Sequence, residues 1–283
     1  MEEYLQGFVS TSIVKTLLAP LERYKLIRQT QDILTLSSKE KMTNFYQFLK
    51  KTIQNEGPKG LFRSNLTAIY MWIPQVYAQY VFYQNIKQAT YDKDLLSMGL
   101  CATLCGITTS IFSYPFDTIR VRQATEIQIP GQKRMYVGFE ETRFNIKIES
   151  GFFKGLYSGF TVGCLQTLLF AYGIVGLNYV LDGTTPYNQQ LAYLGSYALI
   201  YPIDSVRRRL QVKSILFQQE ASKKQNLWDK LKFNMKEWNF SWGYGGFLAH
   251  NVRGIAMLLI LEQVNFESLY KETYNQLNQA LKY

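Results

Sequence analysis

Three stretches with one shared pattern decide how this chain is organised: Pro20-Leu-Glu22-Arg-Tyr-Lys25, Pro115-Phe-Asp117-Thr-Ile-Arg120 and Pro202-Ile-Asp204-Ser-Val-Arg207. Each copy has a proline, an acid two residues later and a base three residues after the acid. An apolar segment precedes each copy and a basic segment follows it. A pattern repeated at long, nearly constant spacing indicates homologous structural units. We therefore predict three units within a single domain, at residues 1–92, 93–184 and 185–283.

The composition favours an all-α membrane protein. Of the 283 residues, 47% are hydrophobic and 18% are charged, below the roughly 25% charged residues of soluble domains. The mean hydropathy of −0.13 is too polar for helices surrounded only by lipid, so we expect the bundle to enclose a water-filled cavity that polar residues line. A soluble helical repeat protein is the alternative. The predicted transmembrane helices, two per unit, are 5–20, 66–88, 95–115, 159–181, 187–202 and 247–266.

The basic residues predict how the chain is oriented in the membrane. Most of the 31 Lys and Arg residues lie in the segments 21–64, 116–158 and 203–245. By the positive-inside rule these three segments lie on one side of the membrane, and both termini lie on the other. An amphipathic stretch in each segment predicts a short helix at the membrane surface. Nucleic-acid binding is another interpretation of a net charge of +10, but the chain shows no nucleic-acid-binding motif.

The repeated pattern also predicts a mechanical element. A proline near the end of a membrane helix bends it, and charges at this depth are costly unless they pair. Around a threefold axis, the acid of each unit can meet the base of the next, which closes the bottom of the cavity with a ring that can be opened. Local helix capping with surface pairing is the competing interpretation. The ring consists of Glu22, Lys25, Asp117, Arg120, Asp204 and Arg207, next to the helix-kink prolines Pro20, Pro115 and Pro202.

Two longer stretches add a resemblance. Lys15-Thr-Leu-Leu-Ala-Pro20-Leu-Glu-Arg-Tyr-Lys25-Leu-Ile-Arg-Gln29 and Glu56-Gly57-Pro-Lys-Gly-Leu-Phe62-Arg63-Ser64 resemble the signatures of the mitochondrial carrier family, and of the ADP/ATP carriers in particular. The likeness covers nearly the whole length. It implies a multi-pass protein of the mitochondrial inner membrane with both termini in the intermembrane space. It also implies alternating access, with the charge ring as the gate on the matrix side.

The resemblance further assigns roles to single residues. Gln29 and Gln211 stand where the family often has glutamines that brace the ring. The candidates for substrate binding are Lys15, Arg208, Arg253 and Phe170, although Lys15 could instead pair with a carboxylate such as Glu262. Met71 and Ala171 occupy positions where the ADP/ATP carriers have arginines. Structural cardiolipin is expected at helix ends beside Gly57 and Gly151, and no other cofactor and no metal is expected.

The sequence departs from the family at the opposite gate. The three acids expected there are replaced by Gln84, Tyr179 and Asn265, and of the bases only Lys87 remains. This loss favours a carrier-fold protein kept as an accessory component of a larger respiratory membrane assembly, in contact with other inner-membrane subunits. The alternative is an active antiporter of adenine nucleotides or another anionic metabolite. An enzyme finds no support, because His250, the sole histidine, has no nucleophile or metal ligand around it in sequence and is expected to serve in packing.

Overall fold

The computed structural model describes residues 11–33, 41–73, 95–128, 134–181, 188–213 and 244–263. Within these ranges the chain forms helices and turns and no strand. The helices are α2 (Ala19–Thr30), α3 (Phe45–Glu56), the 3-10 helix η1 (Pro58–Phe62), α5 (Leu95–Thr125), α6 (Phe139–Ser150), α7 (Phe152–Leu156), α8 (Phe160–Leu181), α9 (Asn188–Lys213) and α12 (Phe247–Gln263). Residues 11–17 and 65–73 are helical as well.

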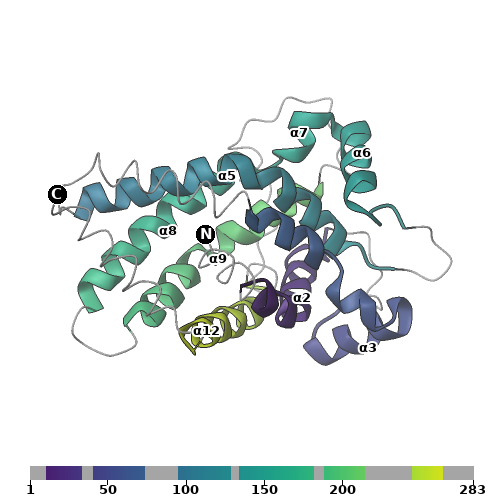
Figure 1. Ribbon diagram of the computed structural model, residues 1–283, viewed down its shortest axis with the longest axis horizontal. Coiled ribbons are helices and arrows are strands. Elements are labelled where there is room, and N and C mark those ends of the chain that lie inside the picture. Colours follow the sequence, from purple (N-terminus) through teal and green to yellow (C-terminus); the bar gives the residue numbers. More distant parts are fainter. Residues whose placement is uncertain are drawn as a thin grey trace, which may run out of the picture.

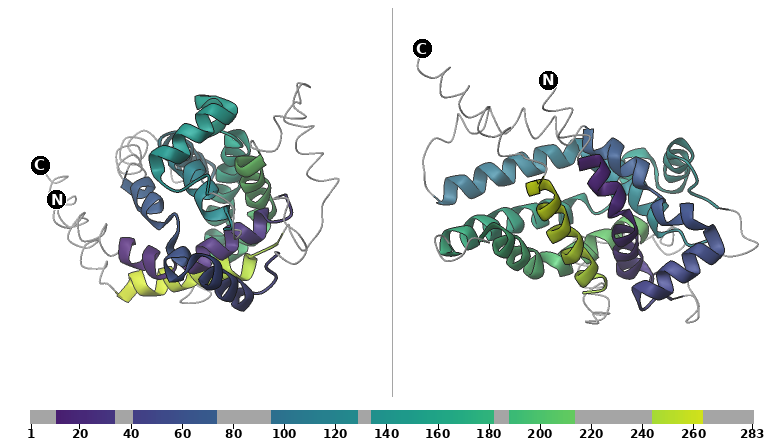
Figure 2. Two further views of the ribbon diagram at one scale, coloured as in Figure 1. Left: turned by 90° about the vertical axis from the view of Figure 1, so that its right-hand side faces the viewer. Right: turned by 60° about the horizontal axis from the view of Figure 1, so that its bottom comes forward.

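The long helices form a bundle with α2 at one side. Helix α8 packs along both α5 and α9, and these three lie side by side in Figure 1. Helix α12 packs against α2, as the right-hand view of Figure 2 shows. Because α2, α5 and α9 also contact one another, the three repeated acid–base patterns are carried by helices that meet.

Within the described part of the chain, two segments are long and apolar enough to cross a membrane: Gly99–Thr125 and Phe152–Leu181. Both present large apolar side chains outward, such as Leu100 and Leu104 on α5 and Leu168 on α8, which suits contact with lipid. They cover the third and fourth predicted spans. The other four spans fall partly outside the described residues, as do the third predicted surface helix and the positions Gln84, Lys87 and Asn265 of the opposite gate.

The three prolines do not act alike. Pro20 follows an interruption at Leu18, where a new helix begins. Helices α5 and α9 instead continue through Pro115 and Pro202 and end ten and eleven residues later, at Thr125 and Lys213. Each proline removes one backbone donor, which a continuous helix tolerates at the cost of one hydrogen bond. The predicted spans 95–115 and 187–202 are therefore shorter than the observed helices, and the charged patterns lie within helix.

The short helices pack against the ends of the long ones. Phe48 of α3 is fully buried against Tyr24 of α2, and Ile146 of α6 is fully buried against Ile119 of α5. In Figure 1, α3 and α6 lie at the same end of the molecule. Both predicted surface helices of the described segments are thus present, and each is anchored by apolar contacts on its own unit.

The backbone repeats with the sequence. Gly57 and Gly151, which end α3 and α6, have φ of 75° and 79°. Another left-handed position is found once in each unit: Ser64 at 71°, Gly159 at 79° and Gly246 at 78°. Left-handed backbone is uncommon for a residue other than glycine, so Ser64 keeps a conformation that glycine adopts in the other two units.

Candidate functional site

The acid–base patterns of α2, α5 and α9 meet in one buried cluster. Lys25 Nζ lies 2.8 Å from Asp204 Oδ2, Arg120 pairs with Glu22, and Arg207 Nη2 lies 3.9 Å from Asp117 Oδ2. Each acid therefore faces the base of the next unit, in a closed cycle. Within units, Arg120 also pairs with Asp117 at 2.7 Å and Arg207 with Asp204 at 3.2 Å. The cycle of contacts is the one that the sequence pattern predicts.

The two glutamines contact the ring acids. Gln29 Nε2 donates to Asp204 Oδ2 at 3.1 Å, and Gln211 Nε2 donates to Asp117 Oδ2 at 3.1 Å. Both side chains are fully buried. The equivalent residue of the second unit is Ala124, which offers no side-chain hydrogen bond. The pair between Glu22 and Arg120 therefore lacks such a contact, and the Glu22 side chain keeps more exposure, 18% against 1% for Asp204.

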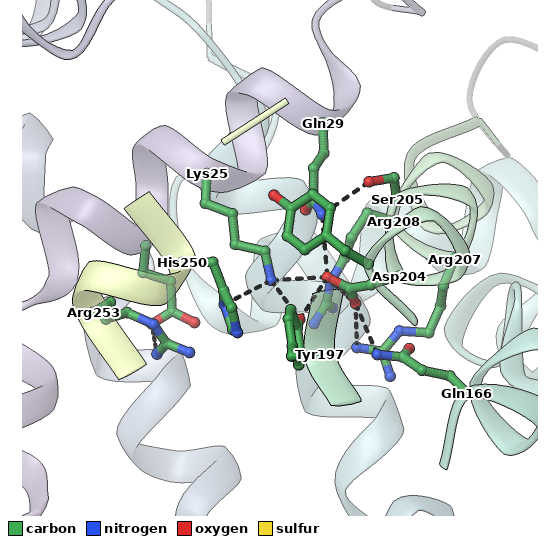
Figure 3. Close-up of polar contacts among 12 residues, drawn as sticks. Lys25, Gln29, Gln166, Tyr197, Asp204, Ser205, Arg207, Arg208, His250 and Arg253 are labelled. Carbon is green, nitrogen blue, oxygen red and sulfur yellow. Dashed lines mark hydrogen bonds and ion pairs between the residues drawn. The ribbon is translucent and has the colours of Figure 1, made fainter. Parts of the chain in front are cut away.

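Asp204 is buried and accepts hydrogen bonds from more protein groups than the other ring acids do. Its Oδ2 accepts from Lys25, Tyr197 and Gln29, and its Oδ1 accepts from Arg207 and Gln166 (Figure 3). Charge-assisted hydrogen bonds of this kind offset the cost of burying a carboxylate. Gln166 and Tyr197 were not predicted, because nothing in the sequence relates them to the repeated pattern.

The substrate-binding candidates lie at or beside the ring. Arg208 Nη1 lies 2.5 Å from Asp117 Oδ2, and Arg253 Nη1 of α12 lies 3.5 Å from Glu22 Oε2. Lys15 Nζ lies 3.8 Å above the centre of the Trp72 ring, a cation–π contact. Phe170 of α8 packs edge-on against Tyr193 and Tyr197 of α9. The structure therefore brings the candidates to one region, with two of the cations in contact with ring carboxylates.

Cations outnumber carboxylates in this region. Among the residues that the structure describes, three acids are present, and six bases face them: Lys15, Lys25, Arg120, Arg207, Arg208 and Arg253. The Nε atoms of Arg120, Arg207, Arg208 and Arg253 are buried, with no hydrogen-bond partner in the described part of the chain. A buried guanidinium N–H without an acceptor is costly. The region therefore has both the net charge and the free donors to bind an anion.

A second ring of arginines, not predicted from the sequence, lies next to the first. Arg23 Nε donates to the Ala124 carbonyl at 3.1 Å, Arg122 Nε to the Gln211 carbonyl at 3.1 Å and Arg209 Nε to the Gln29 carbonyl at 3.0 Å. The three acceptors are equivalent residues, four positions after each ring base, so this cycle also joins each unit to the next. The arginines pair with Glu56, Glu149 and Asp32, respectively.

The sequence contains a partial signal for this second ring. Arg122 and Arg209 each stand two residues after the ring base, but the first unit has Ile27 there and supplies Arg23 from another position. The same contact is therefore made from two different positions in the repeat. Burial alone would raise the pKa of Glu56, but its hydrogen bonds with Arg23 and the charges of Arg23 and Arg63 outweigh burial and hold that pKa below its ordinary value.

The other residues singled out in the sequence lie at turns or in the buried core. Gly57 and Gly151 precede η1 and α7, and a Cβ at either would meet no atom within 4 Å. His250 is buried and contacts Lys25, Tyr193 and Tyr197. Among the described residues, no group of three or more His, Cys, Asp and Glu side chains is placed to hold a metal ion.

A sequence model of one family, described as mitochondrial carrier protein, matches residues 1–94 and 91–179. The chain belongs to the mitochondrial carrier protein family. This membership fits an all-α membrane protein and supports a location in the mitochondrial inner membrane. Proteins of this family are transporters, which is consistent with a chain that is not an enzyme.

Several mitochondrial carriers are similar to this chain at low identity. The mitochondrial ADP,ATP carrier protein 2 of Zea mays is 28% identical over 76% of this chain and 61% of its own length. ADP/ATP translocase 3 of Bos taurus is 24% identical over 75% of this chain and 78% of its own. A mitochondrial coenzyme A transporter of Xenopus laevis is 27% identical over 74% and 67%. The match thus spans less than two thirds of the maize carrier.

Proposed function

We propose that this mitochondrial carrier exchanges an anionic metabolite across the inner membrane by alternating access, with the first charge ring as its matrix gate, closed in this structure. The observation that carries the proposal is the excess of cations at the ring. Six bases face three carboxylates there. An unbalanced buried charge is expensive, and an anionic substrate would offset it, whereas a neutral or cationic one would not.

Adenine nucleotides are the first substrates to test. The plant and bovine relatives are named for ADP and ATP, and the Xenopus relative is named for coenzyme A. All of these compounds carry phosphate groups, which arginine binds through its two-pronged fork. Because Met71 and Ala171 supply no charge where ADP/ATP carriers have arginines, we expect a triphosphate to bind more weakly here than it does in those carriers.

The proposed transport cycle needs the full carrier architecture. It comprises six transmembrane helices in three two-helix repeats, at 1–92, 93–184 and 185–283, with the basic segments in the matrix and both termini in the intermembrane space. The equivalent left-handed residues and the two cyclic rings support this arrangement. We further infer structural cardiolipin beside Gly57 and Gly151, where turns end α3 and α6 close to the basic segments.

Exchange by the reconstituted protein tests the transport proposal. Liposomes that contain the full chain and internal ATP are expected to take up labelled ADP faster than empty liposomes or liposomes without internal ATP. Arg253→Gln removes a guanidinium that pairs with Glu22 and faces the ring. Loss of one charge-assisted contact of about 1.5–3 kcal/mol lowers apparent affinity by about tenfold to a hundredfold.

Arg143→Gln provides the matched control, because Arg143 lies on the surface of α6 with a half-exposed side chain and pairs only within that helix in the described contacts. This variant is expected to exchange at the wild-type rate. If neither nucleotides nor phosphate nor small carboxylates exchange above the rate of empty liposomes, the transport proposal is wrong.

A second candidate function is that of an accessory subunit in a larger membrane assembly. The replacement of all three acids of the opposite gate by Gln84, Tyr179 and Asn265 favours it. Blue-native electrophoresis after mild detergent extraction separates the two functions. An accessory subunit migrates with its assembly, whereas a free carrier of 32.9 kDa migrates alone with bound detergent.

A further inference from the structure

The only histidine of the chain lies against the only lysine of the charge ring. His250 of α12 is 3% exposed. Its Nδ1 lies 3.2 Å from Lys25 Nζ (Figure 3), and its Nε2 lies 3.1 Å from the Tyr193 hydroxyl. The imidazole stacks on the Tyr197 ring, with centres 3.7 Å apart and planes 18° from parallel. The ring is thus held by a stacking contact and by a polar contact at each nitrogen.

The hydrogen bonds around Lys25 fix the protonation of this imidazole. An ammonium group has three donors and no acceptor. Lys25 uses them on Asp204 Oδ2, the Tyr197 hydroxyl and His250 Nδ1. Nδ1 must therefore accept, so the proton of a neutral imidazole stands on Nε2 and is donated to the Tyr193 hydroxyl. A protonated imidazole carries N–H at both nitrogens, and its Nδ1–H would face the ammonium at 3.2 Å.

We propose that His250 is a positioning residue of the matrix gate: the neutral imidazole holds Lys25 on Asp204, and protonation of His250 displaces Lys25 and weakens the closed ring. The role of the ring as a gate rests on the proposed function, whereas the contact between His250 and Lys25 and its dependence on pH do not. The closed ring excludes a proton from His250, so its stability is complete above the ordinary pKa of histidine, about 6.5, and declines as the pH falls below that value, because the separated state takes up the proton. Acidification thus favours the open state of the ring, in which His250 can take up the proton.

The surrounding charges leave a proton on His250 without compensation. Helix α2 presents Lys25 and Glu22, helix α9 presents Asp204 with three tyrosines, and α12 itself presents Arg253. Both carboxylates are already paired with other bases. The tyrosines are Tyr193, Tyr197 and Tyr201. A further positive charge would enter a region in which cations already exceed acids.

The other two pairs of the ring lack this dependence. Arg120 and Arg207 keep their charge at any physiological pH and bind carboxylates through a planar fork, and neither contacts a histidine. Lys25 is a point charge whose direction is set by its three acceptors. Of the three pairs in the ring, the contact between the first and third units is therefore the one that pH can weaken, as the pH falls below about 6.5, the ordinary pKa of histidine.

Nuclear magnetic resonance on the wild-type chain tests the first step directly. The spectrum of full-length protein labelled with 15N-histidine in nanodiscs shows the signals of a single imidazole, because the chain has one histidine. At pH 8 we expect the neutral ring with its proton on Nε2 and an acceptor-type Nδ1. A proton on Nδ1 of the neutral ring, or a ring still protonated at pH 8, would overturn the inference.

Thermal unfolding between pH 8 and 5.5, followed by tryptophan fluorescence, tests the consequence. We expect the unfolding temperature of the wild type to fall by several degrees on acidification. His250→Asn keeps an acceptor near the position of Nδ1 and cannot gain a proton, so its unfolding temperature should change little across this range. His250→Phe keeps the stacking ring without an acceptor and should be less stable at every pH, with an equally flat profile.

Lys25→Met is the decisive control, because it removes the ammonium that opposes a proton on His250. Its unfolding temperature should be low at pH 8 and should not fall further as His250 is protonated. If His250→Asn or Lys25→Met keeps the wild-type dependence on pH, the inference is wrong. The unfolding measurement does not require transport. If liposomes show no exchange while the unfolding temperature still depends on pH as expected, only the proposed function is refuted.

Discussion

At the scale of single residues, the site depends on carboxylates that serve several bases at once. Asp204 contacts Lys25 and Arg207 within ion-pair distance, and Asp117 does so with Arg120 and Arg208. Removal of one such carboxylate weakens the pairing of more than one buried cation. That penalty exceeds the value of any single pair.

Asp204→Asn tests this argument with almost no change of shape. Because it strands buried Lys25 and weakens the contacts of Arg207, we expect a loss of about 3–5 kcal/mol of stability, measured as a lower unfolding temperature of the purified carrier in detergent. Glu140→Gln makes the same chemical change in the exposed pair with Arg143 and should cost less than about 1 kcal/mol. Equal effects in both variants would contradict the argument.

At the scale of helices, the left-handed glycines allow one unit to approach the next. An added Cβ at Gly159 would lie 3.1 Å from Leu210 Cβ and 3.3 Å from the carbonyl oxygen of Arg207. An added Cβ at Gly246 would lie 2.9 Å from Lys25 Cα. In both cases the glycine of one unit faces the ring base of the next. The turns before α8 and α12 therefore help to set the spacing across the ring.

Gly246→Ala is expected to push α12 away from α2. The left-handed backbone alone costs a residue with a Cβ about 1–3 kcal/mol, and the contact with Lys25 Cα adds to this cost. We predict a fall in unfolding temperature, together with weaker pairing of Lys25 and Asp204. Gly176→Ala is the control, because Gly176 lies within α8 with nothing within 4 Å of an added Cβ. The control should leave stability unchanged or slightly raise it.

At the scale of the whole molecule, two cycles of contacts join the three units. The first consists of the ion pairs of the charge ring. The second consists of Arg23, Arg122 and Arg209, each bonded to a backbone carbonyl of the next unit. Both cycles of contacts are closed. Separation of any two neighbouring units in the described bundle would therefore strain the contacts that each of them makes with the third. This geometry suits a gate that opens as a whole.

The orientation proposed for the chain predicts an asymmetric pattern of labelling. With Cys101, Cys105 and Cys164 replaced by serine, Glu141→Cys places a single thiol on the exposed surface of α6. A membrane-impermeant thiol reagent should label it only after the inner membrane is permeabilised, because the basic segments face the matrix. Glu3→Cys, near the N-terminus, should instead be labelled in intact mitoplasts. The reverse pattern would refute the orientation.

The sequence by itself predicted three units, the helical class and a ring of six charged residues; the described residues confirm the helical class and contain ion pairs among those six. It could do so because the pattern recurs at fixed positions and because the charges stand beside apolar segments, where they must pair. The glutamines Gln29 and Gln211 followed from a resemblance, which the family match supports in general and does not test at these residues.

Only the tertiary structure decided which side chains complete the site. Tyr197, Gln166 and His250 come from positions that do not repeat, and Arg23 makes from a different position the contact that Arg122 and Arg209 make in the other units. A sequence pattern records spacing along one helix, whereas these contacts depend on how neighbouring helices cross. The environment of Lys25, and with it the role of the single histidine, therefore followed only once α2, α9 and α12 were packed together.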